Sequence, residues 1–323
     1  MLRDMLAMCQ RDGSWQTVTD LDSLSDLCAD RHNLVWAEVD TNDIPGGLLE
    51  KLAEEFSLHA LAVEDALHAR QRPKLEQYPD HLFVVFQQLD EEDQQLEASQ
   101  IACFIGERWI FALHSGAERT LAEARRRWDE GDMDVDDGAM TLLHTLLDVV
   151  VDDYQDVADR LEVTTEGLEE IALETFNAPI QRQIYQVKQH LARLHRYALP
   201  AARVLDPLVK DNEVISAEIQ HYFRDVSDHL VRINEQVRQS DDLVQAVLDL
   251  VRGEQTNSLN EVTKKLTSWA AIIAVPTFIA SVYGMNLSLI PQGPSVVNFY
   301  FVLGLMAVVA GWLYVVFKKK NWL

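Results

Sequence analysis

Eight small or polar residues recur at alternating spacings of four and three along one stretch of the sequence. They are Thr256, Asn260, Thr263, Thr267, Ala270, Ala274, Thr277 and Ser281. Because an α-helix has 3.6 residues per turn, this spacing places all eight on one helix face, which we call the polar stripe. Its hydroxyls and its amide can hydrogen-bond water, whereas its small side chains would also let a second helix pack closely. The pattern alone therefore leaves two interpretations open, a water-lined pore wall and a helix–helix contact.

The polar stripe continues into a long apolar segment. From Leu266 to Phe317, 52 consecutive residues include no Asp, Glu, Lys or Arg. A bilayer core requires about 20 apolar residues per helix, so this segment predicts two membrane spans, Leu266–Tyr283 and Val297–Phe317. The connector between them, 284–296, is rich in Gly and Pro and cannot continue a helix. We therefore expect 266–323 to form a two-helix transmembrane region.

Lysines flank both predicted spans. Lys264 and Lys265 precede the first span, and three lysines at 318–320 follow the second. Positively charged flanks remain in the cytoplasm, so we expect both termini inside, the connector outside, and a location in the cell or inner membrane. The segment that begins at Met1 lacks the apolar core of a signal peptide, and none is expected.

The rest of the sequence is strongly acidic. The chain carries 52 acidic and 28 basic residues, and 51 of the acids and 23 of the bases lie in the first 255 positions. A nucleic-acid-binding protein needs a basic surface to neutralise phosphates, so this charge argues against that function. No phosphate-binding loop, metalloprotease motif or serine-hydrolase motif occurs, and we expect no enzyme. Cys9, Cys28 and Cys103 lack the spacing of a zinc or disulfide motif.

The acidic part is expected to comprise a mixed α/β domain, 1–135, and a stalk of long helices, 136–265. Apolar runs rich in β-branched and aromatic residues predict strands at 34–40, 81–90, 100–106 and 108–115. Apolar residues spaced three and four apart predict long helices at 141–173 and 181–209. A third helix, from about Glu213 to Tyr283, would be about 105 Å long and would carry the polar stripe into the membrane.

A pore built from the first span would need several copies of the chain. Two spans cannot enclose a pore, and rotational symmetry would place one residue of each copy at the same height. Leu266 lies one residue away from the polar stripe. A ring of its side chains would form an apolar constriction that closes by losing its water.

Gly284-Met285-Asn286 directly follows the first span, and with this motif at the end of so long a helix the chain resembles the CorA family of divalent-cation channels and transporters. Other matching segments extend over nearly the whole sequence. They are RQRPKLEQY (70–78), VDDY (151–154), YFRDVSDH (222–229), the first span and the ending KKKNWL. The resemblance implies an α+β membrane protein, a homopentamer with an N-terminal cytoplasmic α/β domain, long helices forming a funnel, and a pore lined by the first span.

The resemblance also implies which residues form the pore. Asn286 and the backbone oxygen of Gly284, with Met285 between them, would form the entrance, and Thr277 and Asn260 would form polar rings further along. Mg²⁺ dehydrates reluctantly, and neutral oxygens can hydrogen-bond its water shell and still release it. Mg²⁺ is therefore the expected cargo, with Co²⁺ or Ni²⁺ as further cargo.

A second, regulatory metal site is implied for the cytoplasmic part. In the family, acids between neighbouring subunits bind divalent cations and hold the channel closed. The matching residues are Glu64, Asp65 and Asp225, with His229 on the helix face of Asp225 and Asp148 nearby. In so acidic a chain each of these could equally be a solvated helix residue. The basic run 125–127 is expected to pair with neighbouring acids.

Two alternatives remain. The connector contains no acid, where many family members have one soon after Gly-Met-Asn, and it loosely resembles that of the zinc-transporting ZntB branch. A proton-coupled zinc transporter is the first alternative, although no Cys or His after Leu266 could bind a bare Zn²⁺. A membrane-tethered cytoplasmic scaffold without transport is the second.

Overall fold

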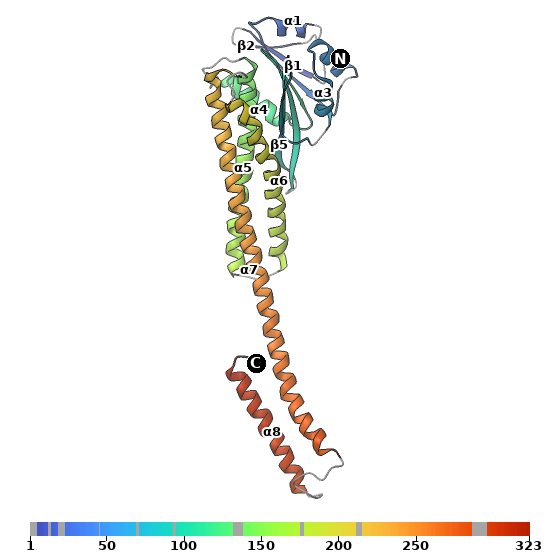
Figure 1. The fold of residues 1–323 in the computed structure, drawn as a ribbon, viewed down its shortest axis with the longest axis vertical. Helices are drawn as coiled ribbons and strands as arrows, with labels where there is room; N and C mark the ends of the chain where they lie inside the picture. Colours follow the sequence, from blue (N-terminus) through green and yellow to red (C-terminus); the bar gives the residue numbers. More distant parts are fainter. Residues whose placement is uncertain are drawn as a thin grey trace. The chain divides into compact units, whose positions relative to one another are not determined.

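The structure is a computed structural model that describes residues 5–11, 14–18, 23–44, 46–68, 71–92, 95–131, 138–174, 178–210, 215–285 and 296–323. The chain divides into two compact units, Met1–Ala246 and Val247–Leu323. A seven-stranded sheet with its covering helices lies in the first unit, and two apolar helical segments form the second (Figure 1).

The sheet has the strand order β2-β1-β3-β7-β6-β5-β4. Its strands are β1 (Met5–Arg11), β2 (Ser14–Thr17), β3 (Leu34–Asp40), β4 (Lys74–Gln77), β5 (Leu82–Glu92), β6 (Gln95–Ile105) and β7 (Trp109–His114). β3 and β7 pair in parallel, and the other neighbouring strands pair antiparallel. The strands that the sequence predicts are confirmed as β3, β5, β6 and β7, whereas β1, β2 and β4 are additional.

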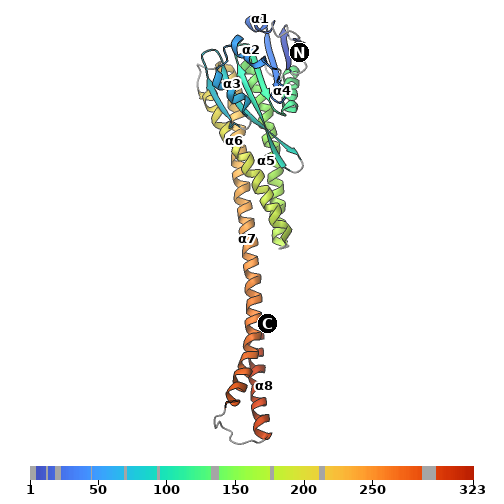
Figure 2. The same cartoon turned by 90° about the vertical axis from the view of Figure 1, so that its right-hand side faces the viewer.

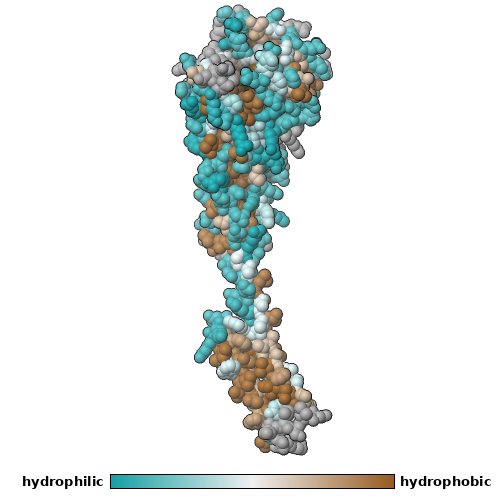
Figure 3. Space-filling model, in the orientation of Figure 1, coloured by the Kyte–Doolittle hydropathy of each residue, from teal (hydrophilic) through white to brown (hydrophobic). Residues whose placement is uncertain are grey.

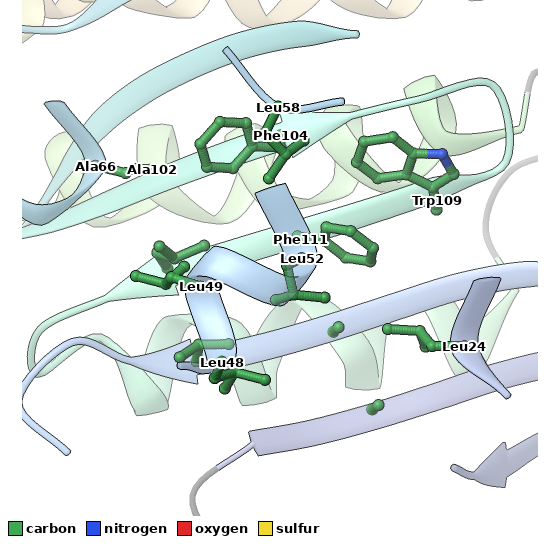
Figure 4. Packing of buried hydrophobic residues seen from close by; sticks show 14 of the residues in the cluster. Leu24, Leu48, Leu49, Leu52, Leu58, Ala66, Ala102, Phe104, Trp109 and Phe111 are labelled. Carbon is green, nitrogen blue, oxygen red and sulfur yellow. The ribbon is translucent and has the colours of Figure 1, made fainter. Parts of the chain in front are cut away.

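Helices cover both faces of the sheet, which explains why its central strands β3 and β7 are buried along nearly their whole length (Figure 2). One face is covered by α1 (Leu24–Ala29), α2 (Leu48–Glu55) and α3 (Ala60–Leu67), and the other by α4 (Glu118–Glu130), α5 (Ala139–Glu174) and α6 (Ala178–Lys210). Figure 4 shows the core on the first face, where Leu52 lies beside Phe111. On the second face, the Tyr154 hydroxyl donates a hydrogen bond to the Gln87 carbonyl oxygen at 2.5 Å.

The helix α7 (Ala217–Tyr283) is continuous over 67 residues and includes Pro276, as the sequence predicts for its third long helix. In the first unit its buried residues recur alternately four and three apart, a heptad pattern that we call the seam. They are Ile219, Phe223, Val226, Leu230, Ile233, Val237, Ser240 and Val244. On α7, Asn234 Nδ2 donates to the Ala198 carbonyl of α6 at 3.1 Å, and Gln236 Nε2 donates to Asp159 Oδ1 of α5 at 2.9 Å. The first unit thus holds α7 against both α5 and α6.

In the second unit, α8 (Val296–Lys319) runs antiparallel to the last part of α7 (Figures 1 and 2). The rings of Trp269 and Tyr314 approach with centroids 6.5 Å apart. Among the described residues, α7 and α8 are the two helices long and apolar enough to cross a membrane. Figure 3 shows apolar side chains gathered on this unit, whereas most of the visible face of the first unit is polar. The two predicted spans lie within these helices.

Candidate ion pathway and cytoplasmic metal site

The polar stripe lies on the face of α7 that the chain's own helices leave uncovered. In the second unit the seam register continues through Ser268, Ile272, Val275 and Ile279, where Ser268 is fully buried and the others are half-buried. Each stripe residue lies one or two residues before a position of the seam register. One residue corresponds to about 100° around the helix and two residues to about 200°, so the centres of the two faces are about 150° apart. All eight stripe residues are exposed in the single chain. Packing of α7 against its own chain therefore does not account for the small and polar residues.

Threonine hydroxyls in the polar stripe are oriented by the helix that carries them. Thr256 donates to the Arg252 carbonyl at 3.0 Å, Thr263 to the Leu259 carbonyl at 2.8 Å, and Thr277 to the Ile273 carbonyl at 2.8 Å. Because each hydroxyl hydrogen is used within the helix, the oxygen lone pairs remain as acceptors. This face of α7 therefore offers hydrogen-bond acceptors to anything that donates from outside the chain.

The end of α7 carries the beginning of the Gly-Met-Asn motif. Gly284 N–H donates to the Ala280 carbonyl at 2.9 Å, and Met285 N–H donates to the Val282 carbonyl at 3.3 Å, which closes the last turn. Both residues are exposed. The third member, Asn286, lies outside the described residues, as does most of the connector.

The proposed constriction residue, Leu266, is 70% exposed in the single chain. Leu259, two turns earlier, is similarly exposed. Two large apolar side chains beside the polar stripe are therefore mostly exposed in the described chain. They can meet lipid, another copy of the chain, or their own copies around an axis.

The two acids of α3 occupy different environments. Asp65 accepts a hydrogen bond from Lys74 Nζ at 2.5 Å and one from Gln71 Nε2 at 3.1 Å. Lys74 also donates to Glu76 Oε1 at 2.8 Å, and this bond is the main reason that the pKa of Glu76 is lowered. Glu64 is exposed and uses its backbone carbonyl to accept from His68. Asp65 is thus already neutralised by a lysine of its own chain.

The other predicted ligands gather where α5 meets α7. Asp148 accepts from Arg127 Nη1 at 2.8 Å, and the side chain of Asp225, 69% exposed, has His229 Nε2 at 3.6 Å. The charges of both carboxylates also act on the pKa of the buried His144, whose ring lies against Tyr222 and Phe223 of α7. Burial lowers the pKa of His144, and the charges of Asp148 and Asp225 act in the opposite direction.

The described residues therefore contain two partial acidic groups rather than one assembled site. Asp148, Asp225 and His229 lie around the α5–α7 contact, whereas Glu64 and Asp65 lie on α3. Within the described ranges, no three His, Cys, Asp or Glu side chains are arranged to hold a metal ion.

Sequence reasoning did not identify two residues that dominate these groups. Lys74 neutralises Asp65 from a different element. His144 interacts electrostatically with Asp148, and its ring lies against Tyr222 and Phe223 of α7. Lys74 lies within the RQRPKLEQY segment, which could have singled it out, but nothing local distinguishes His144. The expected pairing of the basic run is confirmed, since Arg125 pairs with Glu38, Arg126 with Glu123 and Glu130, and Arg127 with Glu123, Asp148 and Asp152.

Comparison with known proteins gives consistent matches in sequence and structure. The family model described as "CorA-like Mg2+ transporter protein" matches residues 32–319. The cobalt/magnesium transport protein CorA of Thermotoga maritima is 32% identical over 281 residues, which cover 85% of this chain and 80% of the relative. A more distant relative, the zinc transport protein ZntB of Photorhabdus laumondii, is 22% identical over 265 residues, covering 78% and 77%.

The fold is matched along its whole length. The structure titled as the complete CorA magnesium transporter from Methanocaldococcus jannaschii superposes with a TM-score of 0.81 at 19% sequence identity, and the match covers 98% of this chain and 99% of the other. The expected architecture, an N-terminal α/β domain followed by long helices and two C-terminal apolar helices, is confirmed.

Proposed function

This chain belongs to the CorA-like Mg²⁺ transporter protein family, and from that premise we propose that it conducts hydrated divalent cations across a lipid bilayer. Mg²⁺ is the primary cargo, and Co²⁺ and Ni²⁺ are further cargo. The observation that carries the proposal is the position of the polar stripe, exposed on the face of α7 opposite the buried Ser268 and the half-buried Ile272.

The stripe suits a cation that keeps its water. A hexahydrated Mg²⁺ presents hydrogens on every side and needs acceptors, and it gives up its water ligands reluctantly. Thr263 and Thr277 supply such acceptors because their hydroxyl hydrogens are bound to the carbonyls of Leu259 and Ile273. Neutral acceptors hold the hydrated ion weakly enough for it to leave.

Five copies of α7 around one axis form the pore in this proposal. A single chain with two spans cannot enclose a water path, and the stripes of symmetric copies would face the axis together. Asn286, Gly284 and Met285 surround the entrance, Ser281, Thr277, Ala274, Ala270 and Thr267 line the path through the membrane, and Thr263 and Asn260 follow on the cytoplasmic side. Leu266 forms the apolar constriction.

Cytoplasmic divalent cations close this pore by joining neighbouring subunits. Glu64 and Asp65 of one copy and Asp225, His229 and Asp148 of the next supply the oxygen ligands. A bound cation cancels the repulsion between these carboxylates and favours the closed ring, and its loss shifts the population toward the open state. Among the described residues no three His, Cys, Asp or Glu side chains are arranged to hold a metal ion, which supports a site shared between copies.

Orientation follows from the lysines beside the membrane segments. Lys264, Lys265 and the three lysines at 318–320 lie at the same end of the two antiparallel helices, so that end faces the cytoplasm together with the first unit. The connector then faces outward, and hydrated cations arrive there.

A zinc transporter coupled to protons is the second candidate, favoured by the likeness to ZntB and by the acid-free connector. A tethered scaffold without transport is the third. Uptake into liposomes that contain the purified protein and a Mg²⁺-sensitive dye separates the three. Mg²⁺ flux that falls in Asn286→Ala supports the proposal, and unchanged flux removes the entrance assignment. Zn²⁺ uptake that requires a pH gradient supports the zinc transporter, and no flux of any divalent cation supports the scaffold.

A further inference from the structure

Five lysines gather at one end of the two apolar helices, and we call them the lysine cluster. They are Lys264, Lys265, Lys318, Lys319 and Lys320. The contact between Trp269 and Tyr314 fixes how the two helices meet. Lys265 precedes Trp269 by four residues and Lys318 follows Tyr314 by four. Because α7 and α8 are antiparallel (Figures 1 and 2), both lysines are displaced from that contact toward the same end, by about one helical turn.

The positive charge of the lysine cluster is not cancelled by the chain around it. From residue 256 onward the sequence has these five bases and one acid, Glu261, although the chain as a whole has a net charge of −24. None of the five ammonium groups forms an ion pair with a described carboxylate. Lys318 Nζ lies 5.8 Å from the centroid of the Tyr314 ring, a contact that leaves its charge in place.

A defined turn holds the last three lysines. Asn321 adopts a left-handed conformation with φ 53° after the end of α8. Asn321 N–H donates to the Lys318 carbonyl at 3.2 Å, and Trp322 N–H donates to the Phe317 carbonyl at 3.0 Å, which together make a Schellman motif. The Trp322 ring folds back onto Phe317, with centroids 5.7 Å apart and planes inclined by 4°. The lysines at 318–320 are therefore part of an ordered cap.

The helix dipole explains only part of this arrangement. Lysines in the last turn of α8 favour its negative C-terminal end. Lys264 and Lys265 lie in the interior of α7, far from either end, where the dipole offers them nothing. A common explanation for all five lysines is a ligand of negative charge at this end of the helix pair.

We propose that the lysine cluster binds the phosphate headgroup of an anionic phospholipid. Tryptophan and tyrosine rings prefer the headgroup level of a bilayer, and Trp269, Tyr314 and Trp322 lie beside the lysines. Unpaired ammonium groups at that level attract anionic headgroups, and basic sites between membrane helices hold them. The proposal rests on the membrane insertion of α7 and α8 in the proposed function, and it concerns the leaflet on the side of the first unit.

The test measures lipid binding to the full-length protein purified in neutral detergent. The protein is titrated with dioctanoyl phosphatidylglycerol or dioctanoyl phosphatidylcholine, and bound lipid per chain is read by native mass spectrometry. We expect binding of phosphatidylglycerol to be at least about a hundredfold tighter. Each neutralised lysine should weaken that binding about fivefold, so K318Q/K319Q/K320Q should lose on the order of a hundredfold and K264Q/K265Q about twenty-fivefold. K318R/K319R/K320R should retain the preference.

A matched control removes the same charge elsewhere. K51Q/K210Q changes two exposed lysines of α2 and α6 and should leave lipid binding unchanged. Equal affinity of the wild type for both lipids would overturn the proposal, as would a K51Q/K210Q loss equal to that of K264Q/K265Q. Displacement of the lipid by millimolar inorganic phosphate would identify a free-anion site and also overturn it. Lipid binding is measured without an ion gradient and is therefore independent of the transport test. A protein that conducts Mg²⁺ but does not prefer phosphatidylglycerol would contradict this inference and leave the proposed function standing.

Discussion

Lys74 Nζ lies 2.5 Å from Asp65 Oδ2, so an ammonium group of the same chain already occupies one position that a regulatory cation would take. The lysine also bonds Glu76, and its side chain and that of Asp65 are both largely buried. A divalent cation that binds Asp65 must therefore compete with Lys74 at Oδ2 or bind Oδ1, which accepts a hydrogen bond from Gln71 Nε2. This competition places the affinity of the proposed regulatory site under the control of a residue outside it.

We predict that Lys74→Gln lowers the free energy of unfolding by about 1 kcal/mol at pH 7, because Asp65 and Glu76 then repel each other without a counter-charge. The loss should be smaller near pH 4. Lys74 lowers the pKa of Glu76 in the folded protein, so its stabilisation is present above the unfolded pKa and disappears as the pH falls through the folded value. Denaturant titrations at both pH values measure this, with the exposed Lys51→Gln as control. Equal losses at both pH values would contradict the prediction.

Removing one stripe hydroxyl should reduce conduction. Thr277→Val keeps the shape of the side chain and removes the acceptor oxygen at that level of the pore in every copy. Each lost hydrogen bond to the cation's water costs about 1 kcal/mol, so we expect Mg²⁺ flux into liposomes to fall about tenfold or more. The neighbouring Phe278→Leu, outside the polar stripe, should have little effect. Similar flux changes in the two variants would place Thr277 outside the ion path.

Reversing one charge of the cytoplasmic site should remove regulation. Asp225→Lys places an ammonium group where the proposed site needs a carboxylate, so internal Mg²⁺ should no longer inhibit flux. Asp242→Lys makes the same charge change elsewhere on α7, where Asp242 pairs with Arg238. Flux at low and at high internal Mg²⁺ is compared in both variants. Inhibition of Asp225→Lys at the wild-type Mg²⁺ concentration would exclude Asp225 from the site.

The buried His144 should make the first unit less stable in mild acid. Burial lowers its pKa in the folded protein, so the unfolded chain binds the proton more readily and stability falls as the pH drops through the unfolded value, about 6.5. His144→Phe keeps a buried ring beside Tyr222 and removes the titration. The melting temperature of this variant should therefore decrease less between pH 7.5 and pH 5.5 than that of the wild type, while the exposed His195→Gln should follow the wild type. Parallel curves for His144→Phe and the wild type would refute the assignment.

Helices and strands with a clear apolar pattern could be predicted from the sequence, whereas short strands with mostly polar residues could not. β3 begins and ends at the predicted residues because its apolar run is bounded by turns on both sides. α7 is recognisable because no proline interrupts it before Pro276. β4 has four residues, three of them polar or charged, and lies at the sheet edge, so its pairing with β5 comes from the tertiary fold rather than from local preference.

The candidate site shows the same division. The polar stripe follows from spacing alone, since a helix converts spacing directly into a face. The ion-pair partners of Asp65 and Asp148 could not be predicted from spacing. Lys74 and Arg127 reach these carboxylates from other elements, whose placement depends on the sheet. The opposition of stripe and seam also required the structure, because burial in the second unit depends on α8.

The shared register of seam and stripe restricts how the length of α7 can vary. One inserted residue between Val251 and Thr256 would shift the polar stripe, together with Ser268 and Ile272 behind it, by about 100° along α7 and out of the heptad register of the seam. Seven inserted residues would restore nearly the same angle and add about 10 Å. Natural or engineered length variants of this segment that still conduct ions should therefore differ by whole heptads.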